Sequence, residues 1–174
     1  MSYLFESERL RFRELTLDDS ENLYLLNKDP EVIKYTGDPP FETVEDAQLF
    51  ISNYKEYTLN GYGRWVVEVK TDGRFIGWSG LKLNEISKID LGYRYLKSEW
   101  GKGYATEAAQ ACLQYGFMTL DMTEIIARAD KENLASLKVI EKIGMQYFME
   151  GVCKTVDKAN YYSISKAQYL DKLR

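Results

Sequence analysis

A glycine-rich segment in the middle of the chain has the sequence Trp100-Gly101-Lys102-Gly103-Tyr104-Ala105-Thr106-Glu107-Ala108. It follows a strand-like alternation and opens a long helical pattern, so backbone N–H groups without helical partners should meet at its start. Glycine at 101 and 103 lets a ligand come close to that backbone, and Lys102 adds a positive charge. The segment therefore predicts an anion site, in particular a phosphate site, at a helix N-terminus.

Two common phosphate-binding motifs do not match this segment. A P-loop needs the pattern G-x-x-x-x-G-K-[ST], and both the glycine spacing and the position of Lys102 differ from it. A dinucleotide-binding fingerprint needs a third glycine where Thr106 stands, and the strands before it should not be antiparallel. On these residues alone, a tight turn that binds no ligand stays open as the alternative.

The strands expected before this segment form an antiparallel meander. Short turns join them, and they cover residues 64–70, 74–83 and 88–96. After the segment, a helix rich in alanine leads to a strand over residues 124–129. A helical crossover joins parallel strands, so we expect one parallel pair within a mostly antiparallel sheet.

The rest of the chain adds elements on both sides of this centre. We expect, in chain order, a strand at 9–14, a helix from Thr16 to about Pro30, a helix from Thr43 to Gly61, a helix at 134–143, and strands at 147–150 and 161–165. The order is β α α β β β α β α β β, with no repeat and no linker. This pattern predicts a single α+β domain over residues 1–174, with its core at about 8–168.

Composition excludes several classes of function. The 174 residues include no histidine, which rules out a Ser-His-Asp or Cys-His mechanism within the chain and any zinc site that needs His. A net charge of −4 and a pI near 5.1 disfavour non-specific nucleic-acid binding. The two cysteines, Cys112 and Cys153, form no Cys-x-x-Cys pair, so we expect reduced thiols and no metal. Without a membrane-spanning run or an export signal, the expected location is cytoplasmic.

Two further motifs favour a ligand at the glycine-rich turn, Asn133-Leu134-Ala135-Ser136 and Ile140-Glu141-Lys142-Ile143-Gly144-Met145. Together with that turn they resemble the GNAT superfamily of acetyl-CoA-dependent N-acetyltransferases, in particular the RimJ/RimL-like branch of ribosomal-protein alanine N-acetyltransferases. Residues 8–13 and 91–93 fit that branch too, and the resemblance covers about residues 8–165. It implies the GNAT fold, a mixed, mostly antiparallel central sheet flanked by helices.

The resemblance also implies acetyl-CoA as co-substrate. Backbone N–H groups of the glycine-rich turn would hold the CoA pyrophosphate, with Trp100 in place of the usual Gln or Arg. The pantetheine arm would lie along a strand that separates from its neighbour, and a family asparagine would contact the cofactor. The cofactor-binding residues so implied are Tyr93, Arg94, Tyr95, Gly101, Lys102, Gly103, Tyr104, Ala105, Thr106, Asn133 and Ser136.

Acetyl transfer needs a base that accepts a proton from the amine and an acid that protonates the departing thiolate. Many family members use a tyrosine as the acid at the position of Ile140, and the RimL-like branch is thought to use a serine at the position of Ser136. Ser136 is therefore the expected acid, and a hydroxyl that satisfies a local N–H at the helix start is the alternative. Without histidine we expect a carboxylate that acts through water as the base. Asp90 is preferred, and Glu68 and Glu150 are also considered.

The acceptor is expected between the loop of residues 35–41, the helix after it, and Trp78 or Tyr93. It would be a primary amine, either a protein N-terminus, an amino acid or another small amine, which attacks directly in a ternary complex. The alternatives are a non-catalytic acyl-CoA-binding module, which Ile140 would suit, and a structural chain that binds no CoA. We expect neither nucleic acid nor membrane as a partner, and the resemblance to this branch suggests a homodimer.

Overall fold

The computed structural model describes residues 2–153 and 156–174. Within these residues, eight strands form one sheet in the order β1-β2-β3-β4-β5-β6-β8-β7. The strands are β1 (Phe5–Glu6), β2 (Leu10–Arg13), β3 (Arg64–Val69), β4 (Phe75–Leu83), β5 (Ile89–Tyr95), β6 (Glu124–Asp130), β7 (Gln146–Cys153) and β8 (Val156–Ser165). The helices are α1 (Ser20–Lys28), α2 (Pro30–Ile33), α3 (Val44–Ser52), α4 (Glu56–Asn60), α5 (Tyr104–Met118), α6 (Leu134–Lys142) and α7 (Lys166–Asp171).

The sheet has the predicted mixture of directions. β3, β4 and β5 form the antiparallel meander, and the β5–β6 pair is parallel, with α5 as the crossover. The other recorded pairs, β1–β2, β2–β3, β6–β8 and β7–β8, are antiparallel. The predicted fold class is therefore confirmed.

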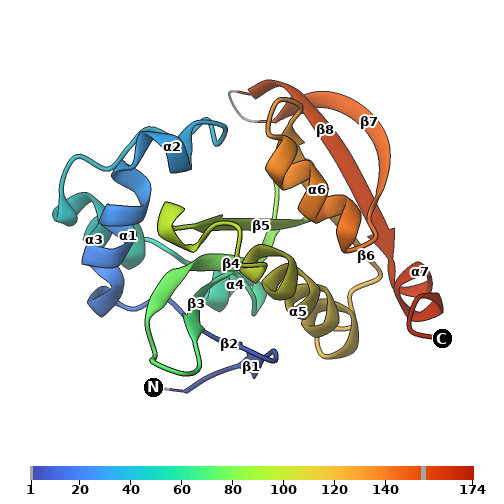
Figure 1. Cartoon of the computed structure of the whole chain (residues 1–174), viewed down its shortest axis with the longest axis horizontal. Helices are drawn as coiled ribbons and strands as arrows, with labels where there is room; N and C mark the ends of the chain where they lie inside the picture. The colour runs from blue at the N-terminus through green and yellow to red at the C-terminus, as the bar shows by residue number, and fades with distance from the viewer. Residues whose placement is uncertain (1, 154–155) are drawn as a thin grey trace.

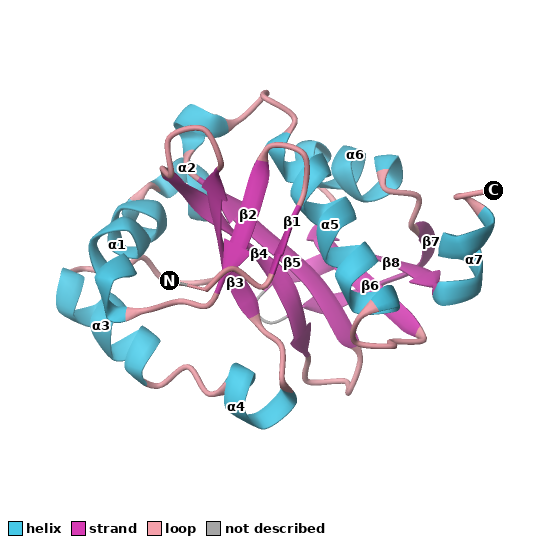
Figure 2. Cartoon of the chain, turned by 90° about the horizontal axis from the view of Figure 1, so that it is seen from below, coloured by secondary structure: helices cyan, strands magenta, loops and turns pink. Residues whose placement is uncertain are grey.

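Helices cover both faces of the meander (Figure 2). On β3, Trp65, Val67 and Val69 point into the large core under α5, because successive strand residues alternate between the two faces. Val66 points the other way and packs with Trp78 and with apolar residues of α1 and α3. The sheet is thus buried on both faces where β3 and β4 cross the molecule.

The parallel strands β5 and β6 separate soon after they meet. Asp90 opposite Ile126 is the one register pair recorded between them in the described residues. β5 then continues to Tyr95, while β6 pairs with β8 along its whole length. Figure 1 shows the consequence, with α1, α2 and α3 on one side of β5 and α6, β7 and β8 on the other. The far half of β5 is left without a strand partner on the β6 side.

The helix predicted from Thr43 to Gly61 is wrong as one helix, because the chain forms α3 and then α4. Gly61 does end α4, with a left-handed φ of +75°. The break lets two tyrosines bond the start of β3. Tyr54 Oη accepts from the Arg64 N–H at 2.8 Å, and Tyr57 Oη donates to the Arg64 carbonyl. These tertiary hydrogen bonds outweigh the helical spacing of the sequence.

Other boundaries also differ from the prediction. Pro30 ends α1 as expected but also begins α2, whose N-cap Asp29 accepts the Glu31 N–H at 2.9 Å. The late strands are longer than predicted because the β7–β8 ladder continues beyond the predicted ends through the pairs Gly151–Ala159 and Cys153–Val156, where the sequence shows no clear alternation. Sequence periodicity missed the two-residue β1 and the terminal helix α7.

Candidate active site

Two glycines in the turn before α5 adopt left-handed backbone conformations. Gly101 has a φ of +76° and Gly103 a φ of +81°, both in the left-handed region that favours glycine. Gly103 is the N-cap of α5 and, without a side chain, makes no capping hydrogen bond. The first N–H groups of α5 therefore lack partners within the helix. A Cβ at Gly101 would meet no described atom within 4 Å, so the turn has room for an anion such as phosphate.

Contacts from two other parts of the chain hold this turn. The Trp100 indole Nε1 donates to the Tyr95 carbonyl at 2.9 Å, and Arg9 Nη1 donates to the Lys102 carbonyl at 3.1 Å. Glu107 accepts from the Arg9 N–H at 2.7 Å and from Arg9 Nε at 2.6 Å. Hydrogen bonds thus connect the turn to the end of β5 and to the segment before β2. The motif gave no sign of this role for Arg9, because Arg9 and Glu107 are far apart in the sequence.

The positive charge of Lys102 is shared with a carboxylate. Lys102 Nζ lies 3.0 Å from Glu99 Oε2, and Arg74 Nη2 lies 3.3 Å from the same oxygen. Arg74 Nη2 is also 3.3 Å from the hydroxyl of Tyr104. Basic side chains therefore surround the turn, but Glu99 offsets part of their charge.

A cavity of about 560 Å³ opens where β5 and β6 separate. It collects five of the predicted site residues, namely Asp90, Tyr93, Arg94, Asn133 and Ser136. Tyr95 and the turn of residues 101–106 are not among its lining residues; Tyr95 is buried at the end of β5. Since the Tyr95 carbonyl bonds Trp100, the free edge of β5 runs from the glycine-rich turn to the cavity.

Tyr93 and Ser136 meet across the cavity. Their hydroxyl oxygens are 2.8 Å apart, and Tyr93 Oη is also 3.2 Å from the Ser136 carbonyl. Burial raises the pKa of Tyr93 to about 12. Asn133 is the N-cap of α6, and its Oδ1 accepts the Ser136 N–H at 3.2 Å, so within the described residues the Ser136 hydroxyl bonds to Tyr93 and not to a local N–H. Ile140 is buried and lines the same cavity.

Asp90 lines the cavity as a member of an ion pair. Its Oδ2 lies 2.6 Å from Arg128 Nε and 2.5 Å from Arg128 Nη2. Burial is the largest influence on Asp90 and raises the pKa of its carboxyl, while the charge of Arg128 opposes that rise. Glu68 is not a lining residue and is held by Arg11 and Arg13.

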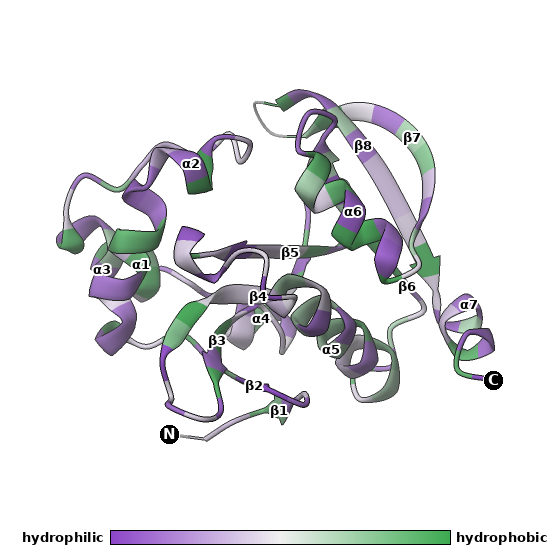
Figure 3. Ribbon diagram, viewed as in Figure 1, coloured by the Kyte–Doolittle hydropathy of each residue, from purple (hydrophilic) through white to green (hydrophobic). Residues whose placement is uncertain are grey.

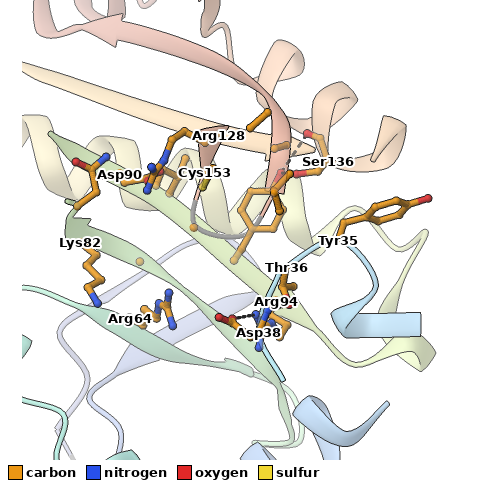
Figure 4. Close-up of a pocket in the computed structure, with 18 of the residues that line it drawn as sticks. Tyr35, Thr36, Asp38, Arg64, Lys82, Asp90, Arg94, Arg128, Ser136 and Cys153 are labelled. Atoms are coloured by element: carbon orange, nitrogen blue, oxygen red, sulfur yellow. Dashed lines mark hydrogen bonds and ion pairs between the residues drawn. The ribbon is translucent and has the colours of Figure 1, made fainter. Parts of the chain in front are cut away.

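Glu150, the third candidate base, is exposed on β7 and does not line the cavity. The predicted acceptor loop does line the cavity, through Tyr35, Thr36 and Asp38 (Figure 4). Trp78 of β4 is a lining residue as well. The helix after that loop, α3, supplies none of the described lining residues.

Arg94 joins the acceptor loop to β5 by its side chain, not only by its backbone. Its Nη2 is 2.7 Å from Asp38 Oδ2, and Nη1 donates to the Asn27 side-chain oxygen. Sequence reasoning missed this role and also missed Arg64 and Arg128, which line the same cavity. The alternation of β3 would have placed Arg64 on the face of Val66, but only the sheet register shows what lies opposite.

In the part of the chain that the structure describes, no three Cys, Asp or Glu side chains come together as metal ligands. No described helix is long and apolar enough to cross a membrane.

The parallel strands of the sheet part beside the glycine turn that begins α5, and a cavity lies in the gap, which is the arrangement expected of an acyltransferase. The chain belongs to the GNAT acetyltransferase family, since the family model described as Acetyltransferase (GNAT) domain matches residues 9–146. It is thus an N-acetyltransferase, and the predicted enzyme class is confirmed.

Individual relatives agree with this membership. The chain is 32% identical to the uncharacterized N-acetyltransferase p20 of Bacillus licheniformis, over 94% of this chain and 96% of that protein. A GNAT-family acetyltransferase from Bacillus anthracis has a similar structure, with a TM-score of 0.82, 28% identity, and coverage of 95% of this chain and 99% of that one. The spermidine N-acetyltransferase of Vibrio cholerae, solved with CoA and spermine, shares the fold with a TM-score of 0.79 at 21% identity, over 93% and 98% of the chains.

Proposed function

We propose that this N-acetyltransferase moves the acetyl group of acetyl-CoA to a primary amine by direct attack in a ternary complex. The observation that carries the proposal is the free edge of β5, which leads from the left-handed glycine turn to the cavity. In this proposal the N–H groups of residues 101–106 hold the pyrophosphate, and the backbone of Tyr93, Arg94 and Tyr95 lines the pantetheine arm. The amine enters from the side of Tyr35 and Trp78.

Acetyl-CoA would supply the acetyl group on a thiol that leaves as a thiolate. Ser136 Oγ is the proposed proton donor to that leaving sulfur, and the hydroxyl of Tyr93 at 2.8 Å would orient it. Asp90 is the proposed base through water, and it is the candidate that lines the cavity. The raised pKa of Asp90, caused by burial, brings its basicity closer to what amine deprotonation requires. Asn133 would contact the cofactor while it caps α6.

We also propose that the whole of residues 1–174 is one domain of the RimJ/RimL-like branch and that it acts as a homodimer. The motif over residues 8–13 and the Ser136 position support the branch. Exposed apolar residues on the edge strand β7 support a partner surface. The proposed acceptor is a protein N-terminus, an amino acid or another small amine.

Calorimetric titration with acetyl-CoA tests the cofactor site. The variant Gly101→Glu should abolish micromolar binding, because it places a side chain and a negative charge in the turn. Gly61→Glu is the matched control, since Gly61 has a φ of +75° against +76° for Gly101 and equally open surroundings. The control should bind acetyl-CoA like the native chain. Equal binding by both variants would refute the assignment of the turn.

Steady-state kinetics test the proposed acid and base. Ser136→Ala and Asp90→Asn should each lower kcat by about 10²–10⁴-fold while acetyl-CoA still binds. Glu85→Gln is a control for Asp90, because Glu85 also pairs with Arg128 but is largely exposed. A loss below about tenfold in either variant would remove that residue from the proposed chemistry.

A further inference from the structure

Arg64 is the first residue of β3, and two glycines of the neighbouring strands lie in the same row of the sheet. In the register, Arg64 lies opposite Gly80 on β4, and Gly80 lies opposite Gly92 on β5. Residues directly opposite each other point to the same face. The backbone of Gly63 covers Gly80, since a Cβ there would lie 2.1 Å from the Gly63 carbonyl oxygen, whereas a Cβ at Gly92 would meet only the Trp78 ring, at 3.4 Å. Gly92 is therefore the glycine that leaves sheet surface uncovered near Arg64. Arg64, Gly80 and Gly92 all line the cavity, and Figure 4 shows the Arg64 side chain at its wall.

The neighbouring rows of the sheet bound this open patch. On one side Trp78 lies opposite Arg94, and the Arg64 guanidinium carbon is 4.3 Å from the centroid of the Trp78 ring. On the other side Lys82 lies opposite Asp90. The patch therefore has an aromatic wall, charged neighbours and room for a small polar group over Gly92.

Most carboxylates that line the cavity form ion pairs with Lys or Arg side chains. The ion pairs are Asp38–Arg94 at 2.7 Å, Asp90–Arg128 at 2.5 Å, Glu56–Lys82 at 3.3 Å and Glu85–Arg128. The carboxylate of Asp130, a further acid of the lining, accepts the Glu132 N–H at 2.8 Å. The Arg64 guanidinium differs, because within residues 2–153 and 156–174 it has the Trp78 contact but no ion pair.

Arg64 also adds positive charge near a second guanidinium. The Arg94 guanidinium carbon is 5.5 Å from the centroid of the same Trp78 ring. Burial is the main cause that lowers the pKa of Arg94, and the charge of Arg64 lowers it further. An anion bound at Arg64 would relieve this repulsion, whereas a polycation would add to it or break one of the ion pairs.

We propose that Arg64, stacked on Trp78 beside the cavity floor at Gly92, binds a carboxylate of the acceptor. The substrate is then a carboxylate-bearing small amine of the amino-acid type, not a polyamine. This inference rests on the proposed function, because it assigns the acceptor side of the same cavity. A guanidinium matches a carboxylate with two parallel N–H donors, which fixes the orientation of the amine as well as its affinity.

The test measures acetylation of amines that differ in charge but share a skeleton. The probes are L-alanine, L-phenylalanine, L-glutamate and β-alanine, the carboxamide of each, and spermidine. Alaninamide has a lower amine pKa than alanine and thus more neutral amine, so a preference for the free acid must come from recognition. The native enzyme should show at least about tenfold higher kcat/KM for an acid than for its amide. A peptide amide that starts with Asp tests whether a side-chain carboxylate can replace the free one.

Arg64→Gln should lower kcat/KM for the preferred acid by about 10–100-fold and leave that of its amide nearly unchanged. The matched control is Lys28→Gln, which removes the same charge from above an aromatic ring, 4.8 Å over Tyr24, outside the cavity. A second variant, Gly92→Ala, keeps Arg64 but puts a methyl group on the floor, 3.4 Å from the Trp78 ring. It should raise KM for the acid while acetyl-CoA binding stays unchanged.

Calorimetry with CoA-saturated protein gives a readout that needs no turnover. The preferred acid should bind to the native chain and bind at least about tenfold more weakly to Arg64→Gln. Preference for spermidine or the amides, equal losses on acid and amide, or no binding of any acid probe would overturn the inference. If acetyl-CoA itself does not bind and no amine is acetylated, the proposed function fails, which is a different result.

Discussion

Gly77 controls how closely β4 approaches β5 beside the cavity. Its φ is +147°, and a Cβ there would lie 2.1 Å from the Arg94 carbonyl oxygen and 2.8 Å from the Tyr95 Cα. Both atoms belong to the backbone of β5, which cannot turn aside as a flexible side chain can. The course of the strand that joins the glycine turn to the cavity therefore depends on this glycine.

We expect Gly77→Ala to lower the free energy of unfolding by more than about 4 kcal/mol, because the contact is with backbone and the φ is unfavourable. Urea unfolding measures this. Gly92→Ala is the control, since its Cβ would reach the Trp78 ring at 3.4 Å, and it should cost about 1 kcal/mol or less. Similar losses for the two variants would contradict the close approach of β4 and β5.

At the scale of elements, the segment before β2 is docked on the first turn of α5. Glu107 accepts hydrogen bonds from the Ser7 hydroxyl at 2.7 Å, from the Arg9 N–H at 2.7 Å and from Arg9 Nε at 2.6 Å. The Arg9 guanidinium carbon also lies 4.6 Å from the centroid of the Tyr104 ring. Through the Lys102 carbonyl, the same arginine reaches the turn that precedes the helix.

Glu107→Gln should lower the free energy of unfolding at pH 7 by about 1–2 kcal/mol, since charge-assisted hydrogen bonds are lost. Burial raises the pKa of Glu107, but the Arg9 N–H, the Ser7 hydroxyl and the Arg9 guanidinium lower it more, and the net shift is downward. A lowered carboxyl pKa stabilises the fold above its unfolded value, about 4.3, and the stabilisation is lost as the pH falls through the folded value.

The cost of Glu107→Gln should therefore shrink between pH 5 and about pH 3 in urea unfolding series. The control is Glu45→Gln, because Glu45 is an exposed acid in the first turn of α3 and reports the helix-dipole effect alone. A cost that does not change with pH would show that the negative charge of Glu107 is not what holds the segment.

At the scale of the whole molecule, the sheet ends in an exposed strand. β7 is the last strand in the sheet order, and hydrophobic and hydrophilic segments follow each other along it (Figure 3). Its exposed apolar residues are Tyr147 at 55%, Phe148 at 49%, Met149 at 43% and Val152 at 61%. Exposed apolar edge strands pair readily with another chain, which is the physical basis for the proposed homodimer.

Sedimentation velocity should find a dimer for the native chain and a monomer for the double variant Phe148→Lys, Val152→Lys, because lysine on an edge strand opposes pairing. Leu59→Lys is the control, as Leu59 is 76% exposed on α4 and should leave the dimer intact. A native monomer, or dissociation by the control as well, would refute a dimer through β7.

Local patterns in the sequence determined the centre of this protein. The turns between the strands of the meander, the alanine-rich helix and the glycines at 101 and 103 each act over a few residues, so the antiparallel strands, the parallel crossover and the helix start could be predicted. The resemblance to the GNAT superfamily indicated Ser136, and the absence of histidine led to a carboxylate such as Asp90; both line the cavity. Their catalytic roles stay predictions.

Tertiary structure alone decided which distant side chains meet. The break between α3 and α4 follows from hydrogen bonds of Tyr54 and Tyr57 to β3, which helical spacing does not encode. Likewise, Tyr93 meets Ser136, Arg9 meets Glu107, and Arg64 faces two glycines only because strand register and helix packing bring them together. Sequence periodicity predicts on which face of a strand or helix a side chain lies. Which distant residue it contacts there depends on strand register and on the packing of the whole sheet.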